Sequence, residues 1–184
     1  GRDPLEFRLQ LIAREHGPSA GCLRAVAEMC EWTGQTADNV GRGVGFTYSF
    51  GTPVAQVVEV VDESGEIRIR KVWIACDVGT ALDPRNIAAQ MMGGAIFGLS
   101  AAAGEEISFA GGEVQQWNYP DYDLLRMHNA PEVAVRVLET NPHLGGVGEA
   151  GTPPAMPALA NALFDLTGTR ARSLPLSKSF PLKL

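Results

Sequence analysis

The sequence has no long apolar segment, no excess of positive charge and no paired cysteine motif. No apolar run reaches the length of about 18 residues that indicates a membrane-spanning helix. Lysine and arginine total 15 against 21 aspartate and glutamate, for a formal net charge of −6, so no basic face for nucleic acid or anionic lipid is expected. The cysteines, Cys22, Cys30 and Cys76, form no C-x-x-C pair, which indicates small buried side chains rather than a disulfide framework or a zinc site.

Common motifs of catalysis and metal binding are also missing. His16, His128 and His143 are scattered, and none has a second histidine four residues away, so no metal held by protein side chains is predicted. There is no G-x-S-x-G elbow and no P-loop. The first residues show no signal-peptide pattern, and we expect a cytoplasmic or periplasmic chain without choosing between the two compartments.

The segments that are present predict a single α+β unit. Residues 1–35 are expected to form a helical lead-in, and residues 41–184 an α+β body. Helices are expected to pack on a small mixed or antiparallel sheet. The strands are expected near 41–50, 54–61, 67–76 and 132–138, helices of the body near 84–103 and 153–167, and a short hairpin near 106–114.

Proline and glycine pairs predict where the helices begin. Asp3-Pro4 and Asp83-Pro84 each put a capping carboxylate before a proline, which is typical of a helix start. Gly17-Pro18 is expected to break the first helix, so that Ser19 caps the second. Thr152-Pro153-Pro154 is expected to cap the last helix, and the tail from Leu174 to Leu184 is expected to be extended.

The helix near 84–103 has an unusual composition. It contains Gly93, Gly94 and Gly98, and each interior glycine costs about 1 kcal/mol relative to alanine. We therefore expect another helix or a ligand to approach this backbone closely. Gln90 precedes the glycine pair; its amide can donate and accept hydrogen bonds, which suits recognition of a heterocycle edge. The alternative is an ordinary surface glutamine.

A glycine-rich loop, Gly145 to Gly151, enters the last helix and holds Glu149 in its middle. Free backbone N–H groups next to a helix N-terminus make an anion site. Gly146, Gly148 and Gly151 fit a G-x-G-x-x-G pattern, but no buried strand leads directly into the loop and no acidic residue ends a second strand, so a dinucleotide fingerprint is not favoured. A plain turn with a solvated glutamate is the remaining alternative.

Taken together, these motifs resemble a known family. Asp77-Val78-Gly79, Asp83-Pro84, Gln90-x-x-Gly93-Gly94 and Gly146-Val147-Gly148-Glu149 occur in this order. They are followed by Pro157-Ala158-Leu159-Ala160-Asn161-Ala162 and Arg170-x-Arg172-x-Leu174-Pro175. The set resembles the late, cofactor-binding segment of the xanthine dehydrogenase and aldehyde oxidase large subunit. It is most similar to the β-subunits of bacterial isoquinoline 1-oxidoreductases, and the similarity runs along essentially the whole chain.

The resemblance implies a molybdenum hydroxylase. Glu149 would be the general base that takes the proton from the water-derived hydroxyl attacking an N-heterocycle or aldehyde carbon. Gln90 would bind the molybdopterin, and Gly93, Gly94 and Gly148 would lie against it. The metal would be held by the pterin rather than by side chains. The cofactor in bacterial members commonly carries a cytosine nucleotide, and electrons leave through an iron–sulfur small subunit.

The family's large subunit is several times longer than this chain. We therefore expect part of a molybdopterin-binding domain that is inactive alone and has the remainder of the large subunit as its partner. The alternative is a non-catalytic relic or interaction module derived from the family. In either case the tail and the glycine-rich helix are expected to expose apolar surface, and self-association is predicted.

Overall fold

The computed structural model describes all 184 residues and has the predicted α+β architecture. Its main sheet has four strands in the order β1-β2-β3-β6. The three consecutive strands pair antiparallel, whereas β6 pairs parallel to β3, so the sheet is mixed. The strands are β1 (Val40–Ser49), β2 (Thr52–Glu63), β3 (Glu66–Asp77) and β6 (Glu132–Leu138), close to the four predicted segments.

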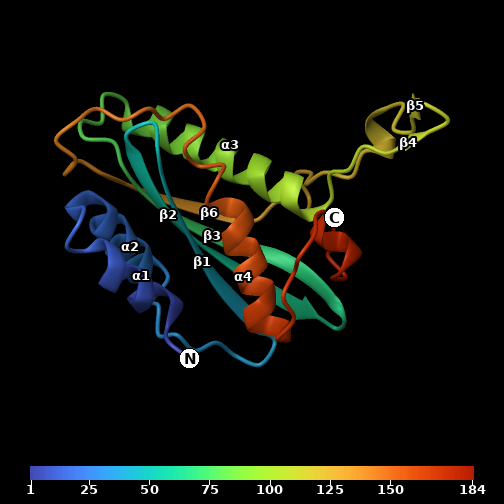
Figure 1. The fold of residues 1–184 in the computed structure, drawn as a ribbon, viewed down its shortest axis with the longest axis horizontal. Coiled ribbons are helices and arrows are strands. Elements are labelled where there is room, and N and C mark those ends of the chain that lie inside the picture. The colour runs from blue at the N-terminus through green and yellow to red at the C-terminus, as the bar shows by residue number, and fades with distance from the viewer.

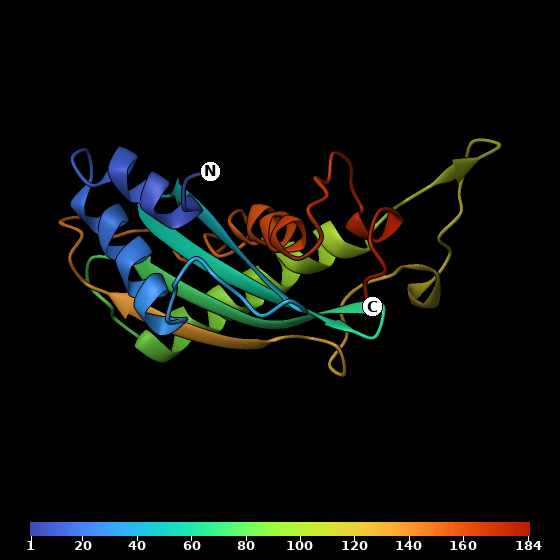
Figure 2. The same cartoon turned by 90° about the horizontal axis from the view of Figure 1, so that it is seen from below.

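Four helices cover the two faces of this sheet (Figures 1 and 2). They are α1 (Pro4–Ile12), α2 (Gly17–Met29), α3 (Pro84–Ala103) and α4 (Ala155–Thr167). Alternate side chains of β2 explain the layers, because Val54 and Val58 pack with α3 and α4, whereas Ala55 and Val57 pack with α2. Both faces of the strand are therefore buried, as its run of valines predicts. No helix combines the length and apolarity that a membrane crossing requires.

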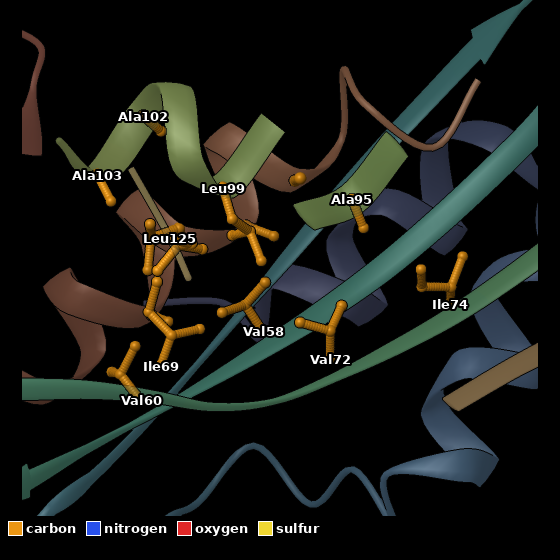
Figure 3. Packing of buried hydrophobic residues seen from close by; sticks show 14 of the residues in the cluster. Val58, Val60, Ile69, Val72, Ile74, Ala95, Leu99, Ala102, Ala103 and Leu125 are labelled. Carbon is orange, nitrogen blue, oxygen red and sulfur yellow. The ribbon is translucent and has the colours of Figure 1, made fainter. Parts of the chain in front are cut away.

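The larger core lies between the sheet and the pair α3 and α4. Figure 3 shows Leu99 and Ala95 of α3 pointing at Val58 and Val72 of the sheet. Leu99, Val58 and Val72 have no exposed surface. This contact fixes α3 over the strands, and α3 also contacts α4. The main core thus holds α3, which borders the predicted site, and α4, which follows the predicted glycine-rich loop.

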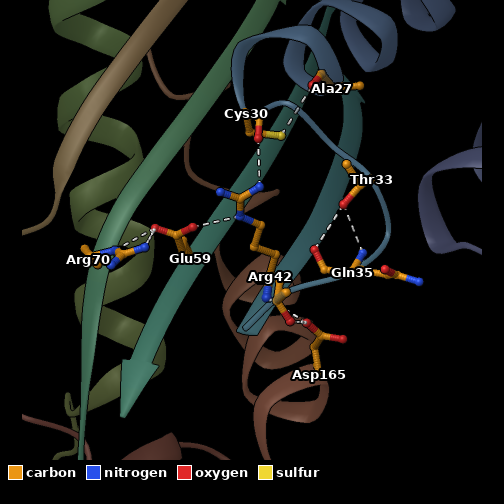
Figure 4. Close-up of polar contacts among 9 residues, drawn as sticks. Ala27, Cys30, Thr33, Gln35, Arg42, Glu59, Arg70 and Asp165 are labelled. Atoms are coloured by element: carbon orange, nitrogen blue, oxygen red, sulfur yellow. Dashed lines mark hydrogen bonds and ion pairs between the residues drawn. The ribbon is translucent and has the colours of Figure 1, made fainter. Parts of the chain in front are cut away.

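A second, polar cluster lies near α2. Glu59 of β2 is 2% exposed and pairs with Arg42 and Arg70, each at an N–O distance of 2.7 Å (Figure 4). Arg42 also donates to the carbonyl oxygen of Cys30 at 2.7 Å and lies over the ring of Trp73. The two guanidinium groups compensate the buried carboxylate and connect the first strands to the end of α2.

The helix starts confirm some caps and correct others. The side chains of Asp3 and Asp83 cap α1 and α3, with proline in the first turn, as predicted. Ser19 does not cap α2; His16 does, because its Nδ1 accepts from the backbone of Ser19 at 3.3 Å. Gly17-Pro18 accordingly forms the first turn of α2 rather than a break between helices.

The last helix also starts differently from the prediction. Pro154 is the N-cap of α4, and no side chain caps the helix. Thr152 is instead part of a turn, in which its N–H donates to the carbonyl of Glu149 at 2.9 Å. Thr152 contacts the glycine face of α3, so this residue is used for packing rather than for capping.

Between α3 and β6 the chain leaves the body as an arm (Figures 1 and 2). The arm contains the predicted hairpin, β4 (Phe109–Ala110) and β5 (Glu113–Val114), with Gly111 and Gly112 at positive φ, and a short helix, η1 (Tyr119–Asp121). Many of its large apolar side chains are exposed: Ile107, Phe109, Val114, Trp117, Tyr119 and Met127.

The C-terminal tail is more buried than predicted. It contains a short helix, η2 (Leu176–Lys178), and Leu182 forms a parallel bridge with Ile67. Leu176 and Phe180 are 1% and 5% exposed and belong to the larger core. The expectation of an extended tail with an exposed apolar patch was therefore wrong for these residues, because they fill the space beside the end of α3. Leu174 alone among the tail's large apolar side chains is strongly exposed.

Candidate functional site

A pocket of about 580 Å³ lies between the start of the β1–β2 turn, α3 and the loop that precedes α4. All five of the predicted site residues line it: Gln90, Gly93, Gly94, Gly148 and Glu149. The first three come from one face of α3, and the other two from the glycine-rich loop, more than fifty residues later. Phe50 and Phe97, both strongly exposed, line it as well. The fold thus brings the two separate motifs to one cavity.

The glycines of α3 have two different tasks. A Cβ on Gly98 would lie 2.6 Å from the carbonyl oxygen of Thr152, and a Cβ on Gly94 would lie 3.2 Å from its hydroxyl. The close approach that the composition predicted is therefore present, but it is made mainly by the turn before α4, with Ala155 of α4 contacting Gly98, rather than by a helix or a ligand alone. A Cβ on Gly93 would meet nothing within 4 Å, so this glycine leaves an open wall in the pocket.

The glycine-rich loop is attached to the end of the sheet. The N–H of Gly146 donates to the carbonyl of Phe50 at 2.8 Å, and the hydroxyl of Thr52 donates back to the carbonyl of Gly146 at 2.8 Å. On the α3 side, Nε2 of Gln90 donates to the carbonyl of Gly148 at 3.2 Å. In this structure Gln90 therefore contacts the loop directly and still borders the cavity.

A buried carboxylate that the sequence reasoning did not assign supports the approach to this loop. Asp77 ends β3, has no exposed surface, and accepts hydrogen bonds from the backbone of Gly79, Thr140 and Asn141. Asn141 in turn donates to the carbonyl of Gly51 at 2.8 Å. The signal in the sequence was an aspartate directly after the apolar run 72–76, followed by Val78 and Gly79.

Several backbone donors in the loop have no partner in the chain. The N–H groups of residues 147–151 donate to no backbone or side-chain acceptor, whereas those of Gly146 and Thr152 do. The carboxylate of Glu149 is solvent-exposed and takes part in no hydrogen bond or ion pair. A run of free amides beside one unengaged carboxylate can hold an electronegative group and present a base to it.

Other chemistry-bearing residues do not gather in the pocket. His16 caps α2, His128 lies in the arm, and His143 lies in the loop after β6, outside the cavity lining. No three histidine, cysteine, aspartate or glutamate side chains come together as a metal site. The three cysteines are free and buried, as the sequence indicated.

Comparison with known proteins gives a consistent family. Residues 14–131 match the family model described as molybdopterin cofactor-binding domain. The beta subunit of isoquinoline 1-oxidoreductase from Brevundimonas diminuta is 39% identical over 95% of this chain, and a subunit of nicotinate dehydrogenase from Pseudomonas putida is 31% identical over 96%. The family match contains Gln90, Gly93 and Gly94, whereas Gly148 and Glu149 lie beyond it.

Solved structures show the same fold. A Cu,Mo-CO dehydrogenase superposes on 64% of this chain with a TM-score of 0.58 and 25% identity. Quinoline 2-oxidoreductase from Pseudomonas putida 86 superposes on 68% with a TM-score of 0.59 and 22% identity.

The chain spans only part of these proteins, since it covers 23% and 16% of the two sequence relatives and 16% and 17% of the two structures. Within that share, the family model, the sequence relatives and the fold agree, and the chain belongs to the molybdopterin cofactor-binding domain family.

Proposed function

We propose that this chain is one wall of the active site of a molybdenum hydroxylase large subunit. The complete enzyme would hydroxylate an N-heterocycle or an aldehyde with oxygen taken from water, and Glu149 would be its general base. The single observation that carries the proposal is the convergence of Gln90, Gly93, Gly94, Gly148 and Glu149 on one pocket. Family membership supports molybdopterin as the group that this pocket serves.

The residues present fit such a group. The unpaired N–H groups of Gly148 and Glu149, which line the pocket, can donate to the oxygen atoms of an anionic cofactor, and the bare backbone of Gly93 lets a flat ring approach α3. Gln90 can keep its Nε2 contact with Gly148 while its Oε1 accepts from a heterocycle edge. When bound, the molybdenum cofactor would supply the two-electron oxidation; we propose its cytosine dinucleotide form.

The chain's own chemistry in this proposal is proton transfer and positioning. Glu149 has no partner that competes for its carboxylate, so it can accept a proton from the attacking water-derived hydroxyl. Gly148 allows the loop to pass close to the cofactor without a side chain. Substrate contacts beyond this wall would come from the rest of the large subunit, and electrons would leave through an iron–sulfur small subunit.

A chain that covers about a quarter or less of its relatives is expected to be inactive alone. The alternative is a non-catalytic relic or interaction module, which the exposed arm favours. The enzyme and the relic are distinguished by purifying the native protein from its own cells, together with any chains that copurify, and measuring its molybdenum and pterin content. Molybdenum and pterin in stoichiometric amounts support the enzyme. A metal-free protein, with no neighbouring reading frame for the missing portion, supports the relic.

The cofactor role is tested by Gln90→Leu in the complete subunit. Losing the Gly148 contact and the amide edge should lower both molybdenum content and the fluorescence of the oxidised pterin. Gln35→Leu, which changes an exposed glutamine in the loop after α2, is the matched control and should retain both. Full cofactor content in Gln90→Leu would refute the assignment of Gln90.

A further inference from the structure

Gln56 is a polar side chain inside the larger core. It lies on β2 between Val54 and Val58, on the face that packs against α3 and α4, and it has no exposed surface. Its cross-strand neighbours are Gly45 of β1 and Ile74 of β3. A methionine or leucine at this position would pack well against the apolar surroundings. The amide must therefore serve a contact that an apolar side chain cannot make.

That contact is to the glycine-rich loop. Nε2 of Gln56 donates to the carbonyl oxygen of Gly151 at 2.6 Å, and its Oε1 has no partner. Leaving a buried acceptor unpaired is unfavourable, which means that Gln56 is not optimised for the stability of the core. The direction of the amide is fixed, because the reverse orientation would put two oxygen atoms together.

Gly151 is held on its other side by α3. A Cβ on Gly151 would lie 2.7 Å from the carbonyl oxygen of Met91, so the residue is confined between β2 and α3. Gly151 lies inside the turn that begins at Glu149, which is closed by the bond from the Thr152 N–H to the carbonyl of Glu149. Any rotation of the peptide between Gly151 and Thr152 therefore changes the turn that holds Glu149 at the pocket.

We propose that Gln56 is a positioning residue for the Glu149 loop. By keeping the carbonyl of Gly151 turned toward the core, it keeps Gly148 and Glu149 at the wall of the pocket. The inference rests on the proposed function, because the orientation of Glu149 matters for catalysis only if Glu149 is the general base. Gln56 itself does not touch the pocket.

The test is amide hydrogen exchange, followed by NMR on this chain. Gln56→Met keeps the length of the side chain and removes its donor. Exchange at Thr152, whose N–H closes the Glu149 turn, is expected to accelerate about tenfold, as for the loss of one buried hydrogen bond. Amides in the centres of β2 and α3 should be unchanged. Unchanged exchange at Thr152 would overturn the proposal.

Two further variants separate positioning from packing. Val58→Ala removes buried apolar surface from the same face of β2 and should accelerate exchange throughout the core, with no preference for Thr152. In Gln56→Glu, burial favours the protonated carboxyl, which can still donate to Gly151 and should restore slow exchange at Thr152. It also provides the test if Gln56→Met fails to fold. Fast amide exchange at Thr152 in the Gln56→Glu variant would contradict the proposal.

In the complete subunit, Gln56→Met should lower kcat while molybdenum content and KM stay near their original values, because the base is misdirected and the cofactor is retained. A parallel loss of cofactor would show a merely structural role. Exchange at Thr152 is measured without cofactor or turnover. The exchange experiment therefore tests the positioning role of Gln56 independently of whether Glu149 is the general base, and either claim can fail while the other holds.

Discussion

Glu59 is a carboxylate buried between two arginines. Leaving a buried charge without its partner costs a large part of the free energy of unfolding. Arg42 and Arg70 each contact one of its oxygen atoms. Glu59→Gln should lower the free energy of unfolding by about 3 kcal/mol, the lower end for breaking a buried pair, because the side chain of Arg70 is half exposed. Urea unfolding measures this change.

Glu63 provides the control for Glu59. Its partners, Arg68 at 3.8 Å and Lys183 at 3.5 Å, lie at the surface. Glu63→Gln should therefore cost less than about 1 kcal/mol. Equal losses for the two variants would mean that burial does not strengthen the Glu59 cluster.

The buried thiols give the chain a dependence on alkaline pH. Burial raises the pKa of Cys30 to about 11 and that of Cys76 to about 12, with Asp77 adding to the second. In the unfolded chain a thiol ionises near its ordinary pKa of about 8.5. Above about pH 8.5 the folded state therefore binds more protons than the unfolded state does. The contribution of these thiols to the free energy of unfolding should be fully present below that pH and should decline as the pH rises toward 11 to 12.

The decline should approach about 1.4 kcal/mol per pH unit for each thiol. Urea unfolding at pH 8 and pH 10 measures it. Cys30→Ala removes one contributor and should reduce the slope, whereas the same slope in this variant would exclude Cys30 as a cause.

At the scale of elements, α3 depends on glycine at some positions and only tolerates it at others. Gly98→Ala should lower the free energy of unfolding by about 1–3 kcal/mol, because its Cβ would overlap the carbonyl of Thr152 and contact Ala155. Gly93→Ala is the matched control on the same helix, where a Cβ meets nothing. It should raise stability by about 0.5–1 kcal/mol through helix propensity. The same sign for both variants in urea unfolding would contradict this packing.

The strands and helices were predictable because local patterns and packing agree. The valines of β2, the alternation in β3 and the Asp-Pro starts of α1 and α3 each determine an element by themselves. Ser19 and Thr152 were misassigned as caps because either residue type can cap a helix; in α2 the ring nitrogen of His16, three residues earlier, takes the N–H of Ser19 instead. The tail was misjudged because its burial depends on space beside α3 that no local pattern reports.

The candidate site was predictable only where a motif carries it. Glu149 and Gln90 stand in recognisable glycine contexts, so they could be named from sequence. Asp77 supports the loop by accepting from the backbone of Thr140 and Asn141, and Gln56 supports it by donating to the carbonyl of Gly151. Contacts between residues so far apart in the sequence leave no periodicity; the position of Asp77 after an apolar run marks it as unusual, but it does not name the backbone groups that either side chain contacts.

At the scale of the whole molecule, exposed apolar side chains remain concentrated on the arm and around the pocket. The arm carries Trp117, Tyr119 and Met127 at 76%, 77% and 100% exposure. Large exposed apolar patches mark interaction sites or cause association, so the isolated chain should self-associate. Light scattering over a concentration series should show a mass above 19.6 kDa that increases with concentration.

Replacing Trp117 and Tyr119 with serine should shift that association to higher concentration. Replacing Arg14 and Glu15, which are exposed polar residues between α1 and α2, with serine should leave the concentration dependence of the association unchanged. A clean monomer of the unaltered chain at high concentration would contradict the prediction, and would indicate that the arm does not act as a contact surface between copies.

The central claim is that Glu149 is the general base of a molybdenum hydroxylase, and single-turnover reduction of the metal centre in the complete subunit tests it most directly. Glu149→Gln keeps the size of the side chain but removes its ability to accept a proton as a carboxylate. General-base assistance is worth about 10²- to 10⁴-fold in rate. Reduction should therefore slow by at least that order while molybdenum content remains full, and Glu113→Gln in the arm should leave it unchanged. Near-normal reduction in Glu149→Gln with full molybdenum would contradict the account.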